Sequence, residues 1–143
     1  MWGIYSWEEF WDIDLSLMGK YIYLVGGADT LFDGTEDVDY NSVIVKMRYD
    51  GTWMYGYYEG ESHVAEEFRG VAAAHDDSFV IAAGYKYMDT NNDWNTVYWT
   101  RFDSNGNVTH RYYFGQCCYN MQVNGVELTR DEGSVVMVGW SAI

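Results

Sequence analysis

Two acidic segments of the sequence place oxygen-bearing side chains at alternate positions. Calcium is bound by several oxygen ligands that converge from a short loop, so this spacing predicts a calcium site in each segment. The EF-hand pattern is broken, because Val38 or Trp94 stands at the glycine position and Ile44 or Thr100 at the final glutamate. Aspartate and asparagine are also common turn residues, so we favour solvated loops without a bound cofactor and keep calcium binding as the alternative. The candidate calcium ligands are Asp33, Asp37, Asp39, Asp89, Asn91, Asp93 and Asn95.

The other reactive side chains give no pattern typical of catalysis. His63 precedes Glu66 and Glu67, but the final histidine of a zinc-binding helix is missing. Cys117 and Cys118 are adjacent, which disfavours a disulfide between them, so we expect free thiols. Adjacent carboxylates in a strand point to opposite faces and could not act together on one bond. The sequence also lacks a nucleophile elbow and a P-loop, so we expect a protein that is not an enzyme.

Aromatic residues make up 19% of the chain and allow two interpretations. Flat amphipathic rings could bind carbohydrate. At the two-residue period of a strand, however, they more often form the packed faces between sheets. The residues concerned are Trp53, Tyr55, Tyr57, Trp94 and Trp99.

Charge and hydropathy exclude several classes of partner. The net charge is −14, with only 8 lysines and arginines, so the chain has no basic surface for nucleic acid or an anionic membrane. Its 48% hydrophobic residues are enough for a folded core. No apolar stretch approaches the roughly 20 residues of a membrane-spanning helix, so we expect no membrane insertion. No basic segment precedes Glu8, and no signal peptide is visible.

An internal repeat sets the elements that carry these residues. Tyr57-Tyr58-Glu59-Gly60 returns 55 positions later as Tyr112-Tyr113-Phe114-Gly115, and Gly70-Val71 returns as Gly125-Val126. An earlier partial copy ends at Gly26. Each copy divides into short strands of period two, joined by turns rich in Gly, Asp and Asn. The expected strands are 13–17, 21–26, 42–49, 52–58, 71–74, 79–84, 96–103, 107–114, 126–129 and 135–139.

A four-stranded meander of this length, rich in aromatics, is typical of a β-propeller blade. Residues 43–53 read aliphatic-x-aliphatic-Lys-x-x-x-Asp-Gly-x-Trp, and a later hydrophobic strand ends in Gly84. This pattern resembles the Lys-x-Asp-x-x-Gly-x-x-x-Trp β-propeller repeats common in large bacterial and protist secreted or surface proteins. The second copy departs from it, because Val108 replaces the tryptophan. The resemblance implies an extracellular or cell-surface location and specifies fold better than function.

We therefore predict an all-β fold of four-stranded antiparallel β-propeller blades. The length gives 143/55, or about 2.6 blades, whereas a closed ring usually needs at least about 4. An incomplete ring is expected. The predicted units are a partial blade at 1–10, a blade at 11–60, a blade at 68–115 and a partial blade at 123–143.

An incomplete ring exposes strand edges, and exposed edges recruit other chains. We expect an interface at Val135, Val136, Met137 and Val138, and at Trp2 and Ile4 in a possible strand at 2–6. The acidic loops are expected to face outward. The predicted function is a structural or protein-interaction module, a fragment or subunit of a larger propeller, whose partners are other copies or a larger protein. A calcium- or carbohydrate-binding surface domain is the alternative.

Overall fold

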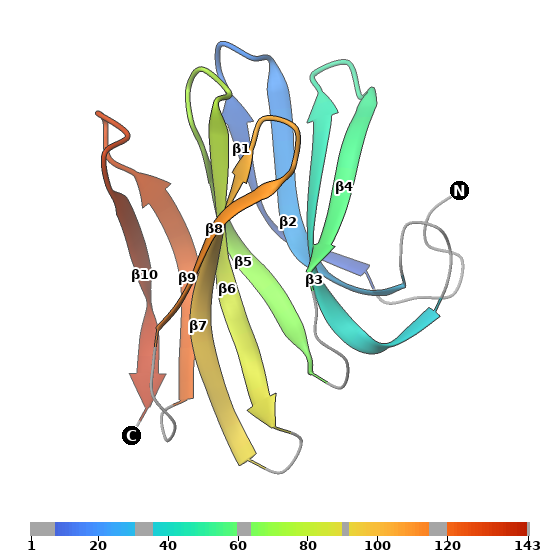
Figure 1. Ribbon diagram of the computed structural model, residues 1–143, viewed down its shortest axis with the longest axis vertical. Helices are drawn as coiled ribbons and strands as arrows, with labels where there is room; N and C mark the ends of the chain where they lie inside the picture. Colours follow the sequence, from blue (N-terminus) through green and yellow to red (C-terminus); the bar gives the residue numbers. More distant parts are fainter. Residues whose placement is uncertain (1–7, 31–35, 60–63, 90–91, 115–119, 143) are drawn as a thin grey trace.

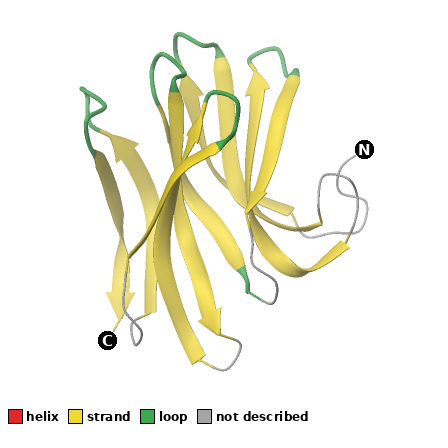
Figure 2. Cartoon of the chain, in the orientation of Figure 1, coloured by secondary structure: helices red, strands yellow, loops and turns green. Residues whose placement is uncertain are grey.

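The computed structural model describes residues 8–30, 36–59, 64–89, 92–114 and 120–142 (Figure 1). These residues form β-strands joined by turns and contain no helix (Figure 2), so the prediction of an all-β fold is confirmed. Within the same residues, no helix is long and apolar enough to cross a membrane. The strands are β1 (Glu8–Ser16), β2 (Tyr21–Thr30), β3 (Glu36–Arg48), β4 (Trp53–Glu59), β5 (Glu66–Ala73), β6 (Phe79–Asp89), β7 (Asn92–Asp103), β8 (Val108–Phe114), β9 (Asn120–Leu128) and β10 (Val135–Ala142).

The strands form three antiparallel sheets, and in each sheet the strands that follow one another along the chain pair with each other. Sheet 1 has the order β1-β2-β3-β4, sheet 2 the order β5-β6-β7-β8, and sheet 3 contains β9 and β10. Tight turns join the strands, and Gly51 and Gly106 take positive φ angles of 84° and 87° at the β3–β4 and β7–β8 turns. A positive φ is the conformation that glycine adopts most easily. The described residues form open sheets and no closed ring.

The three sheets stack side by side, with sheet 2 in the middle (Figure 1). Strand β5 contacts β1, β2 and β3, and strand β9 contacts β5, β6 and β7 in the same relation. We call the face of each sheet that points toward the next sheet in the chain its front face, and the opposite face its back face. One apolar layer lies between sheets 1 and 2 and another between sheets 2 and 3.

The predicted strands end too early at Gly26, Gly84 and Gly139. In the structure β2, β6 and β10 continue past these glycines. Opposite each one, the partner strand carries an extra residue that shifts the register. This β-bulge pushes a carbonyl against the glycine: a Cβ on Gly84 would lie 1.8 Å from the Glu67 carbonyl oxygen, and the other two glycines meet carbonyls at 1.7 and 1.9 Å. The glycines therefore accommodate bulges and do not stop strands.

Candidate interaction surface

The structure changes the setting of the predicted calcium ligands. Strands β6 and β7 extend until Asp89 pairs with Asn92, so Asp93 and Asn95 belong to a strand and not to a loop. Asn95 is buried, and its Oδ1 atom has no hydrogen-bond partner among the described residues. The assignment of residues 92–95 to a loop is wrong, because a hairpin ladder carries polar residues as well as a loop does.

The remaining candidate ligands are only partly described. The backbone of Asp37 and Asp39 belongs to β3. The structure does not describe their side chains, or those of Asp89 and Asp93. Asp33 and Asn91 lie outside the described residues altogether. Within the described part of the chain, no group of three or more His, Cys, Asp or Glu side chains could hold a metal ion. Calcium binding stays a prediction.

Most of the aromatic candidates pack between sheets. Tyr55 and Tyr57 of β4 lie against the apolar layer between sheets 1 and 2, and Trp99 of β7 lies against the layer between sheets 2 and 3. Trp53 is 46% exposed, and the side chain of Trp94 lies outside the description. Carbohydrate binding stays a prediction.

A buried ion pair joins sheet 1 to sheet 2. Lys46 Nζ lies 2.7 Å from Asp77 Oδ2, and both residues are at most 9% exposed. The Tyr23 hydroxyl donates a hydrogen bond to the other Asp77 oxygen, and Lys46 also donates to the Ser104 carbonyl at 3.0 Å. Asp77 belongs to the β5–β6 turn and takes a φ of 66°, which aims its side chain back toward sheet 1. Asp77 is therefore a turn aspartate whose side chain is buried between two sheets.

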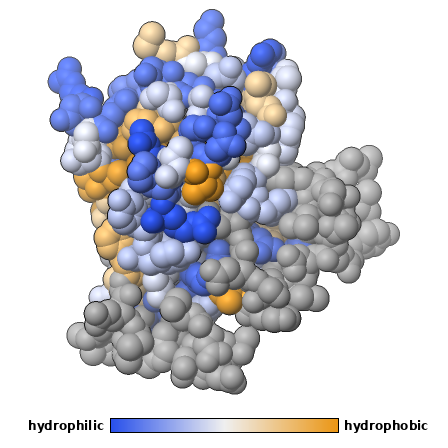
Figure 3. All heavy atoms as spheres, viewed as in Figure 1, coloured by the Kyte–Doolittle hydropathy of each residue, from blue (hydrophilic) through white to orange (hydrophobic). Residues whose placement is uncertain are grey.

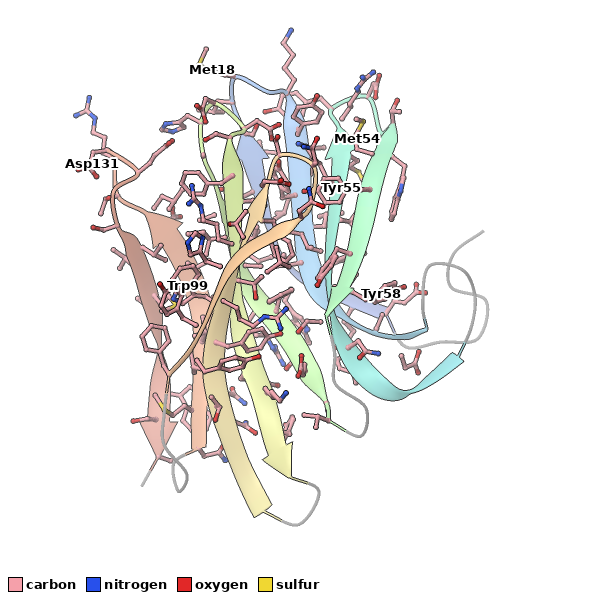
Figure 4. All side chains as sticks on the ribbon, in the orientation of Figure 1. Met18, Met54, Tyr55, Tyr58, Trp99 and Asp131 are labelled. Carbon is pink, nitrogen blue, oxygen red and sulfur yellow. The ribbon has the colours of Figure 1, made fainter. Side chains whose placement is uncertain are left out.

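Aromatic rings enclose the ammonium group of this pair. Lys46 Nζ lies 4.1 Å from the Tyr21 ring centroid, 5.3 Å from that of Tyr23 and 5.8 Å from that of Tyr55. Such rings stabilise a cation that has lost its water. Burial and the neighbouring Asp77 raise the pKa of Tyr23 and of Tyr55, so both phenols stay neutral. Figure 4 shows Tyr55 close to the β7–β8 turn, where its ring packs on Gly106.

Two aspartates of β1 in sheet 1 accept hydrogen bonds from β5 in sheet 2. The backbone N–H groups of Val71 and Ala73 donate to Asp12 Oδ2 at 2.9 Å and Asp14 Oδ2 at 2.7 Å. Beside them, the bulged residues Trp11 and Arg69 stack, with the guanidinium carbon 3.6 Å from the indole ring centroid. Sequence reasoning missed these roles, although carboxylates alternating with apolar residues along β1 were the available signal.

The contact between sheets 2 and 3 repeats part of this arrangement in the described residues. Arg101 lies 4.1 Å from the Phe79 ring centroid, just as Lys46 lies over a ring at the matching place in sheet 1. Glu132 occupies the turn position of Asp77 but contacts His75, accepting from its backbone N–H at 2.7 Å and lying 3.2 Å from its Nδ1. In the described residues, an apolar layer fills the space between sheets 2 and 3.

The predicted interface at β10 divides into two sides. Val135 and Met137 point back and pack against the apolar layer between sheets 2 and 3. Val136 and Val138 point forward and are 50% and 62% exposed. Figure 3 shows apolar side chains reaching the surface on the flank where β10 lies in Figure 1. The predicted interface residues Trp2 and Ile4 lie outside the described residues.

Both outer faces of the stack expose apolar side chains at positions whose equivalents in sheet 2 are buried. On the back face of sheet 1, Ile13 and Leu15 are 56% and 42% exposed. Strand pairing puts Val71 and Ala73 of sheet 2 at the matching positions, and there they are buried against sheet 1.

The front face of sheet 3 shows the same relation. By register, exposed Val136 and Val138 match Ile81 and Ala83 of sheet 2. Those two residues are buried against sheet 3, at 3% and 0% exposure. Each end of the stack therefore exposes the kind of face that the interior buries.

No known family model matches this sequence, and no curated protein matches it either.

Proposed function

We propose that this chain is a non-enzymatic interaction module, built from propeller-type blades, that joins other copies of itself through the two outer faces of its sheet stack. The observation that carries the proposal is the match between exposed and buried positions. Ile13 on one end and Val136 on the other stand where sheet 2 has Val71 and Ile81, both nearly fully buried.

The geometry of such a contact follows from the two contacts inside the chain. In both, the front face of one sheet packs on the back face of the next. In the described part of the chain, no sheet packs on the front face of sheet 3 or on the back face of sheet 1, and the two strands of sheet 3 cover the front face of sheet 2 only in part. A front-to-back contact between copies is heterologous, so it generates a ring or an open stack.

Sheets 1 and 2 and the partial sheet 3 correspond to the blades expected from the repeat. Three features support this interpretation. The first strands of the three sheets are β1, β5 and β9, and β5 contacts both of the others. Each of these strands carries one bulge, and each bulge faces a glycine. Blade number in the full assembly follows from how many copies associate.

Charge sets the conditions for association. A net charge of −14 on every copy produces mutual repulsion, which salt screens over about 10 Å at 0.1 M. Apolar contact is not weakened by salt in this way, so association is expected to increase as salt is added.

Light scattering after size exclusion tests the proposal. We expect a mass above 16.6 kDa that rises with protein concentration in about 0.5 M salt, conditions under which the surface charges are screened. Val136→Asp removes the front face and should return the monomer mass. Val108→Asp, at a position of β8 that is 36% exposed and outside both end faces, is the matched control. A monomer under all conditions, or equal loss with the control, would overturn the proposal.

A further inference from the structure

A long groove runs beside β10, on the front face of sheet 2. It consists of two adjoining hollows of about 480 and 340 Å³ that share Phe114 and Met137. Trp99 and Val97 of β7 belong to the floor, and β10 forms one wall. Figure 4 shows Trp99 in the space between sheet 2 and β10.

The wall of this groove is a strand edge. Strand β10 pairs with β9 on one side, and among the described residues it pairs with no strand on the other. In sheets 1 and 2 the corresponding edges of β2 and β6 are occupied by β3 and β7. An edge with unpaired N–H and C=O groups is a template for one more strand.

The floor is apolar and continuous with an existing packed contact. Trp99 and Met137 already lie against the apolar layer between sheets 2 and 3. Phe114 is 44% exposed, and Tyr112 beside it is 51% exposed although it stacks on Trp99 at 4.7 Å. A strand added to β10 would place every second side chain on these rings, as Phe102 of β7 does on Tyr57 at 5.2 Å in the other contact.

We infer that this groove binds an extended, basic segment of another polypeptide, which adds to β10 as an antiparallel strand. The apolar floor selects apolar residues at alternate positions of the segment. The net charge of −14 selects basic residues at the positions between them, which face solvent, and it disfavours a strand from a second, equally acidic copy. This site rests on and deepens the proposed role as an interaction module, and of the end-face residues named above it shares only Val138, which also lines one of the hollows.

A labelled peptide of alternating valine and lysine, matched in length to β10, tests the inference by fluorescence anisotropy. We expect saturable binding that weakens at least tenfold in Phe114→Asp, whose side chain lines both hollows. Val136→Asp adds the same charge on the forward side of β10 and lines neither hollow, so it should bind the peptide as the unmodified chain does. Circular dichroism confirms folding, and Phe114→Ala replaces the first variant if that one unfolds.

Two peptide controls separate the parts of the inference. Methylation of alternate backbone nitrogens blocks strand pairing and should abolish binding. Replacement of lysine by glutamate should also abolish it. Equal binding of the methylated peptide, or equal binding by Phe114→Asp, would overturn strand addition, and equal binding of the glutamate peptide would overturn the basic partner. Absence of binding by the valine-lysine peptide would overturn the site itself.

The two variants also distinguish this site from the proposed self-association. Val136→Asp should lose self-association and keep peptide binding, whereas Phe114→Asp should do the reverse. If Val136→Asp abolished both, the groove and the end face would be one surface, which contradicts the inference.

Discussion

At the scale of single residues, the molecule depends on a few buried polar links between sheets. The link between Lys46 and Asp77 is the most enclosed of those described, because three aromatic rings and the Tyr23 hydroxyl surround it. Breaking a buried pair by removing one charge is strongly destabilising, whereas removing both charges often is not. Lys46 and Asp77 were each visible in the sequence, one in a strand and one in a turn, but nothing in the sequence paired them.

Asp77→Asn should lower the free energy of unfolding by about 3–5 kcal/mol, since it leaves the Lys46 ammonium buried without a counter-charge. Asparagine tolerates the positive φ of this turn, so the backbone should keep its shape. The double variant Lys46→Met/Asp77→Asn should recover most of the loss. Urea denaturation of the single and double variants measures the coupling, and additive losses would contradict a direct pair.

Acid should destabilise the fold through the turns. Four turn aspartates accept hydrogen bonds that lower their pKa: Asp50, Asp76, Asp103 and Asp131. Their contribution is present above the unfolded pKa of about 4 and is lost as pH falls through the lowered value. Burial raises the pKa of Glu67, so its contribution has the opposite sign: it is present below the unfolded pKa and lost as pH rises. Four groups against one predict lower stability in acid.

Urea midpoints at about pH 5 and about pH 2.5 measure this dependence. Asp103→Asn should reduce the difference between the two midpoints, because Asp103 accepts from the backbone N–H groups of Asn105 and Asn107, each at 2.9 Å. A difference unchanged by this variant would show that the turn aspartates do not set the acid response.

At the scale of strands and turns, the sequence predicts much of the fold. Alternating apolar residues locate every described strand, and Asp50-Gly51 and similar pairs locate the turns. Strand ends were predicted less well, because the bulged residues Trp11, Arg69 and Asn124 share no residue type. A bulge depends on pairing between strands, which a single strand does not reveal.

Gly84→Ala should destabilise the protein by about 3 kcal/mol or more, at or above the upper end of ordinary overpacking costs. The added Cβ would lie 1.8 Å from the Glu67 carbonyl oxygen, so the bulge would have to move. Gly133→Ala is the matched control, because the nearest atoms to its Cβ would be those of the Asp131 carboxylate, at an ordinary contact distance of 3.5 Å. Thermal melts compare the two, and equal melting temperatures would show that the glycine opposite the bulge is dispensable.

At the scale of the whole molecule, three stacked sheets present a back face at one end and a front face at the other. The two-residue period of the aromatic residues predicted that sheets would pack against each other through aromatic faces. It did not predict which faces remain uncovered, because sheet order in space depends on packing between distant segments. The exposure of Ile13 and Val136 indicates uncovered faces only by comparison with sheet 2, where neighbouring sheets cover the matching positions.

Mixing two variants tests the front-to-back contact most directly. Ile13→Asp spoils only the back face and Val136→Asp only the front face, so each alone should be monomeric in light scattering. An equimolar mixture retains one intact front and one intact back, and should form a species of twice the 16.6 kDa chain mass. If either variant dimerised alone, or if the mixture stayed monomeric, the front-to-back contact would be contradicted.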